Sequence, residues 1–278
     1  MLTGSEIKKY ITKERIGRIF CLDSTVSTNL IAAQMTEQGV SDGTVVIADT
    51  QTAGAGRLGR SFYSPAKAGI YLSYIKLLSR SDAAENSDMQ KITKPSPVLP
   101  NLGLLTSLAG LSVCSAITEA SGLLPQIKWP NDIIIDNKKV CGILTKLITD
   151  SKTNQLTHAI IGIGINVNQA EGDFPADLSE KAGSLRMVLG YELDRAKLCA
   201  DIINRIDTLF FIENALFSDA ASSVNRLREL SCTLGKKVTV SSPNGEETVF
   251  ALDIAPDGGL IVKTDTGTKV IISGEISG

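Results

Sequence analysis

The sequence predicts an α+β fold in which one large mixed domain is followed by a small all-β unit. Strand-like and helical patterns alternate as far as residue 230, whereas only short β-like runs separated by turn signals follow. A chain of 278 residues can hold one large domain with a small appendage. We therefore expect domains at residues 1–230 and 231–278.

The large domain is predicted to begin with one helix and two strands on either side of a glycine-rich loop. The helical pattern starts at Ser27, a residue type that caps helices, and it stops at Gly39. Polar residues and prolines then fill a stretch that is typical of a surface loop. The expected elements are a helix over 27–39, strands over 44–48 and 70–77, the glycine-rich loop 51–60 and the surface loop 79–100.

The second half of the large domain is predicted to supply three helices and four strands. Gly122 stops an apolar helical run, and Asp194 stands where it can cap a later amphipathic helix. Asp136-Asn137-Lys138 is the expected hairpin turn. The helices are expected over 102–120, from 194 onward and up to about 230, and the strands over 126–129, 133–135, 140–148 and 157–166.

The C-terminal unit is recognised by its regular turn signals. A unit of this size buries little surface on its own, so we expect a small barrel or meander packed on the large domain. The turn signals are Pro243-Asn244-Gly245, Pro256-Asp257-Gly258-Gly259 and Asp265-Thr266-Gly267.

Composition argues against several classes of function. The 28 Lys and Arg residues against 30 Asp and Glu give none of the basic excess that nucleic-acid binding proteins carry. No apolar run reaches the ~18–20 residues that span a bilayer. Five scattered cysteines suit a reducing compartment, so we expect a soluble cytoplasmic protein with no nucleic-acid or membrane partner. The single histidine, His158, leaves too little for a Ser-His-Asp relay or a multi-histidine metal site.

Two lysines and an Asn-Asp pair mark the strongest candidate site. Lys128 and Lys139 flank apolar strands, where lysine charge suits a carboxylate or a phosphate. The oxygens of Asn131 and Asp132 suit a hydrated Mg²⁺ carried on phosphates. The alternative is that both side chains only brace the hairpin.

The glycine-rich loop reads Gly54-Ala55-Gly56-Arg57-Leu58-Gly59, which matches the dinucleotide-binding pattern. That fingerprint requires a helix at the third glycine, but Pro65 disfavours one here. We interpret the loop instead as a flexible backbone that presents Arg57 and Arg60 to an anion, with a mobile solvated turn as the alternative.

Gly162 and Gly164 lie on one face of a predicted strand, because strand side chains repeat every two residues. We expect them to form a floor free of side chains for a planar ligand, with tight packing as the alternative. Floor, arginine loop and lysines together indicate activation of a carboxylic acid by a nucleoside triphosphate.

The ordered set of these motifs resembles the biotin protein ligase family over nearly the whole chain. The motifs are Ser27-Thr28-Asn29, the loop from Gln51 to Arg60, Ser64-Pro65, Lys128 to Asp132, Lys139 with Gly142-Ile143-Leu144, Gly162 to Asn166, and Gly274-Glu275-Ile276-Ser277.

The resemblance implies a mixed sheet like that of class II aminoacyl-tRNA synthetases, followed by a small SH3-like β-barrel. It also implies two reactions. Biotin and Mg·ATP give biotinyl-5′-AMP and pyrophosphate, and a lysine of a biotin carboxyl carrier protein then takes the biotin. Family members often pair through a sheet edge, so a homodimer stands beside a monomer as an alternative.

The resemblance also implies residue roles. Lys139 and Arg57 are the expected catalytic residues, with Lys139 favoured over Lys138 only by motif register. The expected biotin-binding residues are Ser27, Thr28, Asn29, Gln51, Gly54, Gly142, Leu144, Gly162 and Gly164. The expected ATP-binding residues are Arg57, Arg60, Lys128, Asn131, Asp132 and Asn166, with Asn131 and Asp132 also on the metal.

Three residues depart from the family pattern. Ala55 replaces an arginine, Phe62 a tryptophan and Lys146 an acidic residue. Few residues precede Ser24, so we expect a monofunctional ligase without an N-terminal DNA-binding domain. A lipoate or octanoate ligase and a non-catalytic biotin sensor are the competing hypotheses.

Overall fold

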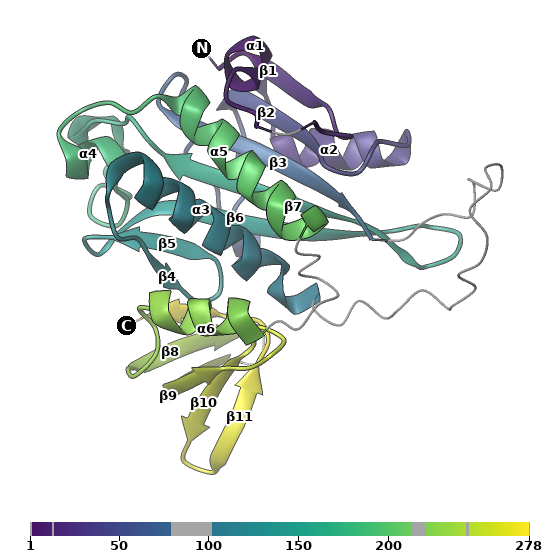
Figure 1. Cartoon of the computed structure of the whole chain (residues 1–278). Coiled ribbons are helices and arrows are strands. Elements are labelled where there is room, and N and C mark those ends of the chain that lie inside the picture. The colour runs from purple at the N-terminus through teal and green to yellow at the C-terminus, as the bar shows by residue number, and fades with distance from the viewer. Residues whose placement is uncertain (1, 13, 79–101, 213–220, 243–244, 278) are drawn as a thin grey trace.

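The computed structural model describes residues 2–12, 14–78, 102–212, 221–242 and 245–277. Its larger part is built on a seven-stranded mixed sheet with the order β1-β2-β3-β7-β6-β5-β4 (Figure 1). Strands β1 and β2 are parallel, and the other neighbours are antiparallel. The strands are β1 Ile19–Thr25, β2 Thr44–Gln51, β3 Gly69–Leu77, β4 Gln126–Lys128, β5 Asp132–Ile135, β6 Lys138–Thr149 and β7 Leu156–Asn166.

Helices cover both faces of this sheet. Helices α3 and α5 lie on one face and α2 on the other (Figure 1). Strand alternation explains the two layers: Val45 and Ile47 of β2 join the α3 side, while Val46 packs with Ala32 of α2. The helices are α1 Gly4–Lys8, α2 Thr28–Glu37, α3 Leu105–Ser121, α4 Leu185–Leu189, α5 Arg195–Asp207 and α6 Ala221–Leu230.

The helix ends follow the capping residues in the sequence. The Asp194 carboxylate accepts hydrogen bonds from the backbone N–H groups of Ala196 (2.9 Å) and Lys197 (3.1 Å), which begins α5. Gly122 ends α3 in a left-handed conformation with φ 72°, where a Cβ is strained. Both predicted boundaries are confirmed.

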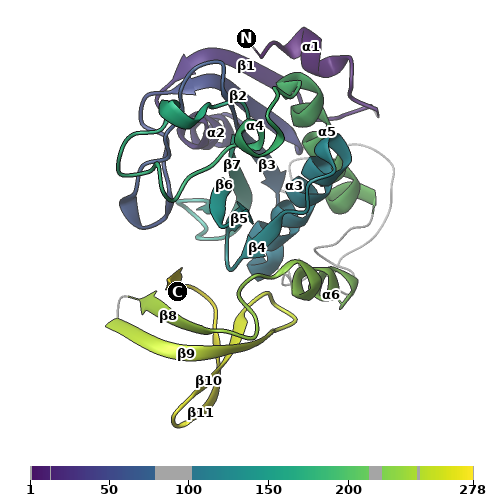
Figure 2. The same cartoon turned by 90° about the vertical axis from the view of Figure 1, so that its left-hand side faces the viewer.

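A second, five-stranded antiparallel sheet has the order β11-β10-β9-β8-β12 and lies at the α6 end of the molecule (Figure 2). Its hydrophobic core contains Val238, Val240 and Val262, and also Trp129 from the large sheet's β4–β5 connection. Its strands are β8 Lys237–Ser242, β9 Gly245–Ile254, β10 Leu260–Thr264, β11 Gly267–Ile271 and β12 Glu275–Ser277.

Trp129 ties the two sheets together. Its indole Nε1–H donates to the carbonyl of Gly258 at 2.9 Å, and its backbone N–H donates to Oγ1 of Thr233 at 3.0 Å. Just before α3, a Cβ on Gly103 would lie 2.3 Å from the Asp257 carbonyl oxygen of the same turn. Glycine at 103 therefore allows a close approach that a side chain would block.

The α+β class is confirmed, as are the predicted helices and strands within the described residues. The sequence reading missed α1, β1 and α4. The hairpin turn is confirmed at Asp136 and Asn137, although Lys138 already belongs to β6. The predicted surface loop 79–100 and the first two residues of the turn at 243–245 lie outside the described residues. Within the described part of the chain, no helix is long and apolar enough to cross a membrane.

Candidate functional site

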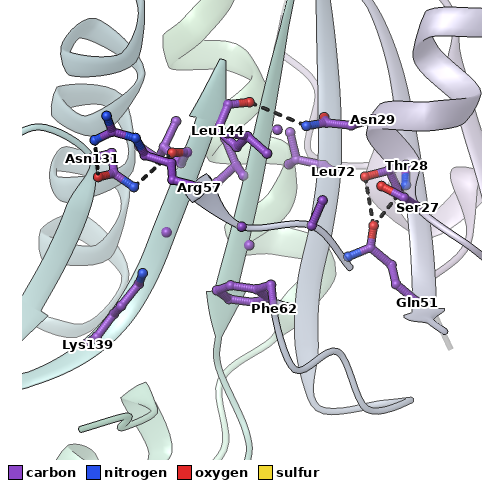
Figure 3. A pocket seen from close by; sticks show the side chains of 17 residues that line it. Ser27, Thr28, Asn29, Gln51, Arg57, Phe62, Leu72, Asn131, Lys139 and Leu144 are labelled. Carbon is purple, nitrogen blue, oxygen red and sulfur yellow. Dashed lines mark hydrogen bonds between the residues drawn. The ribbon is translucent and has the colours of Figure 1, made fainter. Parts of the chain in front are cut away.

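A small cavity of about 50 Å³ lies on the α2 side of the large sheet, above the middle of β6 and β7 (Figure 3). The start of α2, the glycine-rich loop and the strands β3, β6 and β7 contribute its walls. It is lined by Ser27, Thr28, Asn29, Gln51, Ala55, Gly56, Arg57, Phe62, Leu72, Asn131, Lys139, Gly142, Ile143, Leu144, Gly162, Ile163 and Gly164.

One end of the cavity carries a connected set of hydroxyl and amide groups. Oε1 of Gln51 accepts hydrogen bonds from the backbone N–H of Thr28 (2.8 Å) and from its Oγ1 (3.1 Å). The Ser73 hydroxyl lies 2.8 Å from Thr28 Oγ1 and 2.6 Å from Asn29 Oδ1. Ser27 and Thr28 are buried, so this end offers preoriented polar groups within a closed wall.

The glycine floor is covered, which corrects the expectation of a bare surface. A Cβ at Gly162 would lie 2.4 Å from Oδ1 of Asn29, and one at Gly164 would lie 2.6 Å from the ring of Phe62. These glycines make room for two side chains that rest directly on the sheet. Phe62 thus occupies space beside Gly142 and Gly164 in this conformation.

Two cations stand at the opposite end (Figure 3). Nζ of Lys139 lies 2.7 Å from Oδ1 of Asp132, and Nη1 of Arg57 donates to Oδ1 of Asn131 at 3.2 Å. Nδ2 of Asn131 in turn donates to the Ile143 carbonyl at 3.1 Å. Burial lowers the pKa of Arg57, and the carboxylate of Asp132 opposes that shift. The arrangement can therefore hold negative charge that develops between Lys139 and Arg57.

The structure distinguishes the two adjacent lysines. Lys139 lines the cavity, whereas Nζ of Lys138 points to the backbone carbonyl of Ser179 at 3.2 Å. Consecutive residues of a strand face opposite sides, which accounts for the separation.

Four residues predicted for the nucleotide do not line this cavity, namely Arg60, Lys128, Asp132 and Asn166. Arg60 forms an ion pair with Glu275 of β12. Asn166 is buried and its Oδ1 accepts a hydrogen bond from Gln169 Nε2 at 3.0 Å. Lys128 ends β4, where it pairs with Asp132 in the strand ladder. Gly54 also lies outside the cavity wall, with the Phe62 carbonyl oxygen 2.5 Å from where its Cβ would stand.

The donor set fits a metal ion that arrives with its ligand better than a resident one. No group of three or more His, Cys, Asp or Glu residues among the described residues could hold a metal. Oδ1 of Asp132 is buried and accepts no hydrogen bond, so its contact with Lys139 is ionic. One carboxylate oxygen beside the Asn131 amide suits Mg²⁺, which usually keeps several waters and phosphate ligands.

A second, larger cavity of about 390 Å³ adjoins the first and was not anticipated from the sequence. It shares Arg57, Asn131, Ile143 and Leu144 with the first cavity. Its other walls come from α3, the Trp129-Pro130 turn and the Asp257-Gly258-Gly259 turn. Because these segments are distant in sequence, no local motif could predict their meeting.

Two family models match the chain. Residues 20–166 match the Biotin/lipoate A/B protein ligase family, and residues 233–277 match the Biotin protein ligase C terminal domain. The first match ends at Asn166 and includes every lining residue of the small cavity.

Individual relatives agree with the family models. The chain is 32% identical to the bifunctional ligase/repressor BirA of Bacillus subtilis, over 99% of this chain and 78% of that protein. It is 26% identical to the biotin–[acetyl-CoA-carboxylase] ligase of Paracoccus denitrificans, over 92% and 98% of the two chains. Its structure resembles that of the Aquifex aeolicus biotin protein ligase in complex with biotin and ATP, with a TM-score of 0.73, 29% identity and coverage of 94% and 97%.

Proposed function

This chain belongs to the Biotin/lipoate A/B protein ligase family, and on that premise we propose that it attaches biotin to a lysine of a biotin carboxyl carrier protein at the expense of ATP. The reaction is that of a biotin–[acetyl-CoA-carboxylase] ligase. It proceeds in two half-reactions through biotinyl-5′-AMP.

The observation that carries this function is the polarity of the small cavity. Its Thr28–Gln51 end offers hydroxyl and amide groups that suit the ureido ring of biotin, and its other end offers Lys139 and Arg57 to a carboxylate and a phosphate. A purely apolar acyl chain would make no use of these groups, because its end carries no hydrogen-bond donor or acceptor. The cavity therefore suits biotin better than lipoate or octanoate.

Lys139 and Arg57 act on the charge that builds during adenylation. One oxygen of the biotin carboxylate attacks the α-phosphorus of ATP, a C–O–P linkage forms, and pyrophosphate leaves with the electron pair of the broken P–O bond. Two cations beside the reacting oxygens stabilise this transition state more than the separated substrates. Closure of the loop that carries Arg57 keeps water from the mixed anhydride.

We assign the biotin-binding surface to the residues that the family resemblance implies. Those residues are Ser27, Thr28, Asn29, Gln51, Gly54, Gly142, Leu144, Gly162 and Gly164. The nucleotide falls to Arg57, Arg60, Lys128, Asn131, Asp132 and Asn166. Phe62 must leave the floor for biotin to lie on Gly164, since its ring rests against that glycine.

Mg²⁺ is part of the proposal as a partner of ATP. It would be held by Asn131 and Asp132 together with the phosphates, and it would neutralise phosphate charge during the displacement. Oδ1 of Asp132, which is buried and accepts no hydrogen bond, supports this assignment.

The remaining proposals concern architecture and setting. We assign residues 1–230 to a catalytic domain of the class II aminoacyl-tRNA synthetase type and residues 231–278 to an SH3-like barrel. Five free cysteines support a cytoplasmic location, because such thiols persist in a reducing compartment. We expect no nucleic-acid or membrane partner, and a homodimer remains an alternative to a monomer.

Biotin-dependent exchange of labelled pyrophosphate into ATP tests the proposal, with lipoate and octanoate as parallel acids. Exchange with biotin alone is the expected result. Exchange with lipoate instead would transfer the activity to lipoate ligation, and biotin binding without exchange would indicate a sensor.

A further inference from the structure

The larger cavity has no role in adenylation as derived above, yet it shares Arg57, Asn131, Ile143 and Leu144 with the small one. Arg57 and Asn131 are hydrogen-bonded to each other at this shared wall. The two cavities therefore meet at the group that stands beside the activated carboxylate. Figure 3 shows Arg57 and Asn131 at the end of the small cavity that lies opposite Thr28 and Gln51. Because both residues also line the larger cavity, whatever enters that cavity approaches the anhydride from this end.

The walls of the larger cavity suit a long aliphatic side chain. Trp129, Pro130 and Leu144 supply apolar surface, and the paired hydroxyls of Thr106 and Thr145, 2.8 Å apart, lie beside them. Ser107 is buried on the α3 wall. Four methylene groups can pack on such walls while a polar terminus passes onward.

The charges of this cavity favour a cation over a nucleotide. Its described lining contains one cationic residue, Arg57, which is shared with the small cavity, and one carboxylate, the exposed Asp257. A triphosphate requires several cations or a nest of N–H groups. An ammonium group approaching from solvent is instead attracted by Asp257.

The lining of the larger cavity also reaches the protein surface. Ile272 is one of its lining residues and is 79% exposed. A side chain of a second protein could therefore enter past Ile272 and pack on it.

We propose that the larger cavity is the entry channel for the acceptor lysine, with the Arg57–Asn131 pair as its inner gate. This inference rests on the proposed function, because that function requires a lysine from a second protein to reach the anhydride. The Asp257 turn of the C-terminal sheet forms part of the channel, so this sheet contributes to the second half-reaction.

The chemical step balances without a further reactant. The incoming ammonium group releases one proton to water at the channel mouth, and the free pair on its nitrogen attacks the carbonyl carbon of biotinyl-5′-AMP. A C–N bond forms, the C–O bond to the phosphate breaks, and AMP leaves with that electron pair. The nitrogen then releases a second proton to water, giving the amide.

Narrowing the channel tests the proposal, with adenylation and transfer measured separately. Ser107→Leu replaces a small side chain on the channel wall with a larger one. Ser112→Leu is the matched control, since Ser112 is an equally buried serine on α3 that lines a different cavity. We expect Ser107→Leu to change biotin-dependent pyrophosphate exchange by less than about twofold and to slow transfer from preformed biotinyl-5′-AMP to an apo carrier domain about tenfold or more.

Hydroxylamine serves as a small nucleophile that does not fill the channel. Ser107→Leu should release biotin hydroxamate at the rate of the unaltered protein, which a general loss of folding could not reproduce. Equal losses in exchange and transfer would overturn the proposal in favour of a nucleotide role. Unchanged transfer to the carrier would overturn it in favour of another entry route.

Charge reversal at the mouth gives a second test that does not disturb the interior. Asp257→Lys should raise KM for the apo carrier domain about tenfold at low salt and leave kcat nearly unchanged, with Asp257→Asn in between. An unchanged KM in both variants would contradict the proposal. Absence of biotin-dependent exchange in the unaltered protein would instead refute the proposed function, so the two failures are distinct.

Discussion

Nζ of Lys139 lies 2.7 Å from Oδ1 of Asp132, and this contact joins the start of β6 to the start of β5 at the cation end of the small cavity. The neighbouring Lys138 reaches the Ser179 carbonyl instead. The two lysines are neighbours on one strand and have the same charge and length, but their ammonium groups lie in different surroundings.

This pair of lysines supplies a matched test of catalysis. Lys139→Met should lower biotin-dependent pyrophosphate exchange about 100-fold or more, because it removes a cation from the reacting oxygens. Lys138→Met should change exchange by less than about twofold, a difference within the effect of an ordinary surface substitution. Initial exchange rates at saturating biotin and ATP give the comparison. Equal losses of exchange rate in both variants would show that Lys139 has no specific catalytic role.

The covered floor predicts a specific coupling between Gly162 and Asn29. Gly162→Ala should lower the free energy of unfolding by about 1–3 kcal/mol, because its Cβ would lie 2.4 Å from the Asn29 amide. In an Asn29→Ala background the same change should cost much less, since the obstructing group is gone. Urea unfolding of the four proteins measures the coupling. Purely additive costs would show that Asn29 does not rest on Gly162.

Trp129 is expected to stabilise the C-terminal sheet through the hydrogen bond of its indole N–H as well as through its buried apolar surface. Trp129→Phe leaves the Gly258 carbonyl without its donor and should cost about 2 kcal/mol of unfolding free energy. Far-ultraviolet circular dichroism in urea follows the unfolding transition. Tryptophan fluorescence cannot serve, because the substitution removes the only tryptophan of the chain. Tyr191→Phe, on a side chain that is 55% exposed, is the control and should be nearly neutral. A neutral Trp129→Phe would contradict the indole hydrogen bond.

The single histidine predicts a defined pH dependence. Burial lowers the pKa of His158, against an opposing effect of Asp42, so the unfolded chain takes up the proton first as the pH falls. The free energy of unfolding should therefore be constant with respect to this group above its usual pKa of about 6.5 and should decrease below it, until the folded pKa is passed.

The one imidazole resonance in a proton NMR titration measures the folded pKa of His158 directly. His158→Asn should remove the corresponding slope from urea unfolding curves on the acid side of about 6.5. A titration midpoint of His158 above about 6.5 would contradict the prediction, because the free energy of unfolding would then increase as the pH falls.

Much of the fold followed from local signals, and the misses have physical causes. Helix α5 carried both a capping aspartate and a helical period, so its start at Arg195 was confirmed. Strand β1 was missed because its burial does not alternate: residues such as Phe20 and Asp23 are exposed on a strand that pairs on only one side. Helices α1 and α4, with 5 residues each, are too short to show a period.

The candidate site was predicted only where its residues belong to local sequence motifs. Motif order brought Thr28, Gln51, Lys139 and Gly164 to one cavity, as expected. The partner of Arg60 was hidden, because Glu275 lies 215 positions away in sequence. Phe62 was noted only as a departure from the family, since nothing local indicates that its ring would lie on the glycine floor.

Trp129 also limits how the C-terminal sheet can be exchanged between relatives. Its side chain belongs to the hydrophobic core of that sheet, although its backbone belongs to the segment that presents Asn131 to Arg57. A chimaera joined near residue 231 would take five strands from one parent and the tryptophan at their centre from the other. Grafts of this region therefore need the 129–131 turn and the 257–259 turn from the same parent, or the recipient inherits a mismatched core beside its reaction centre.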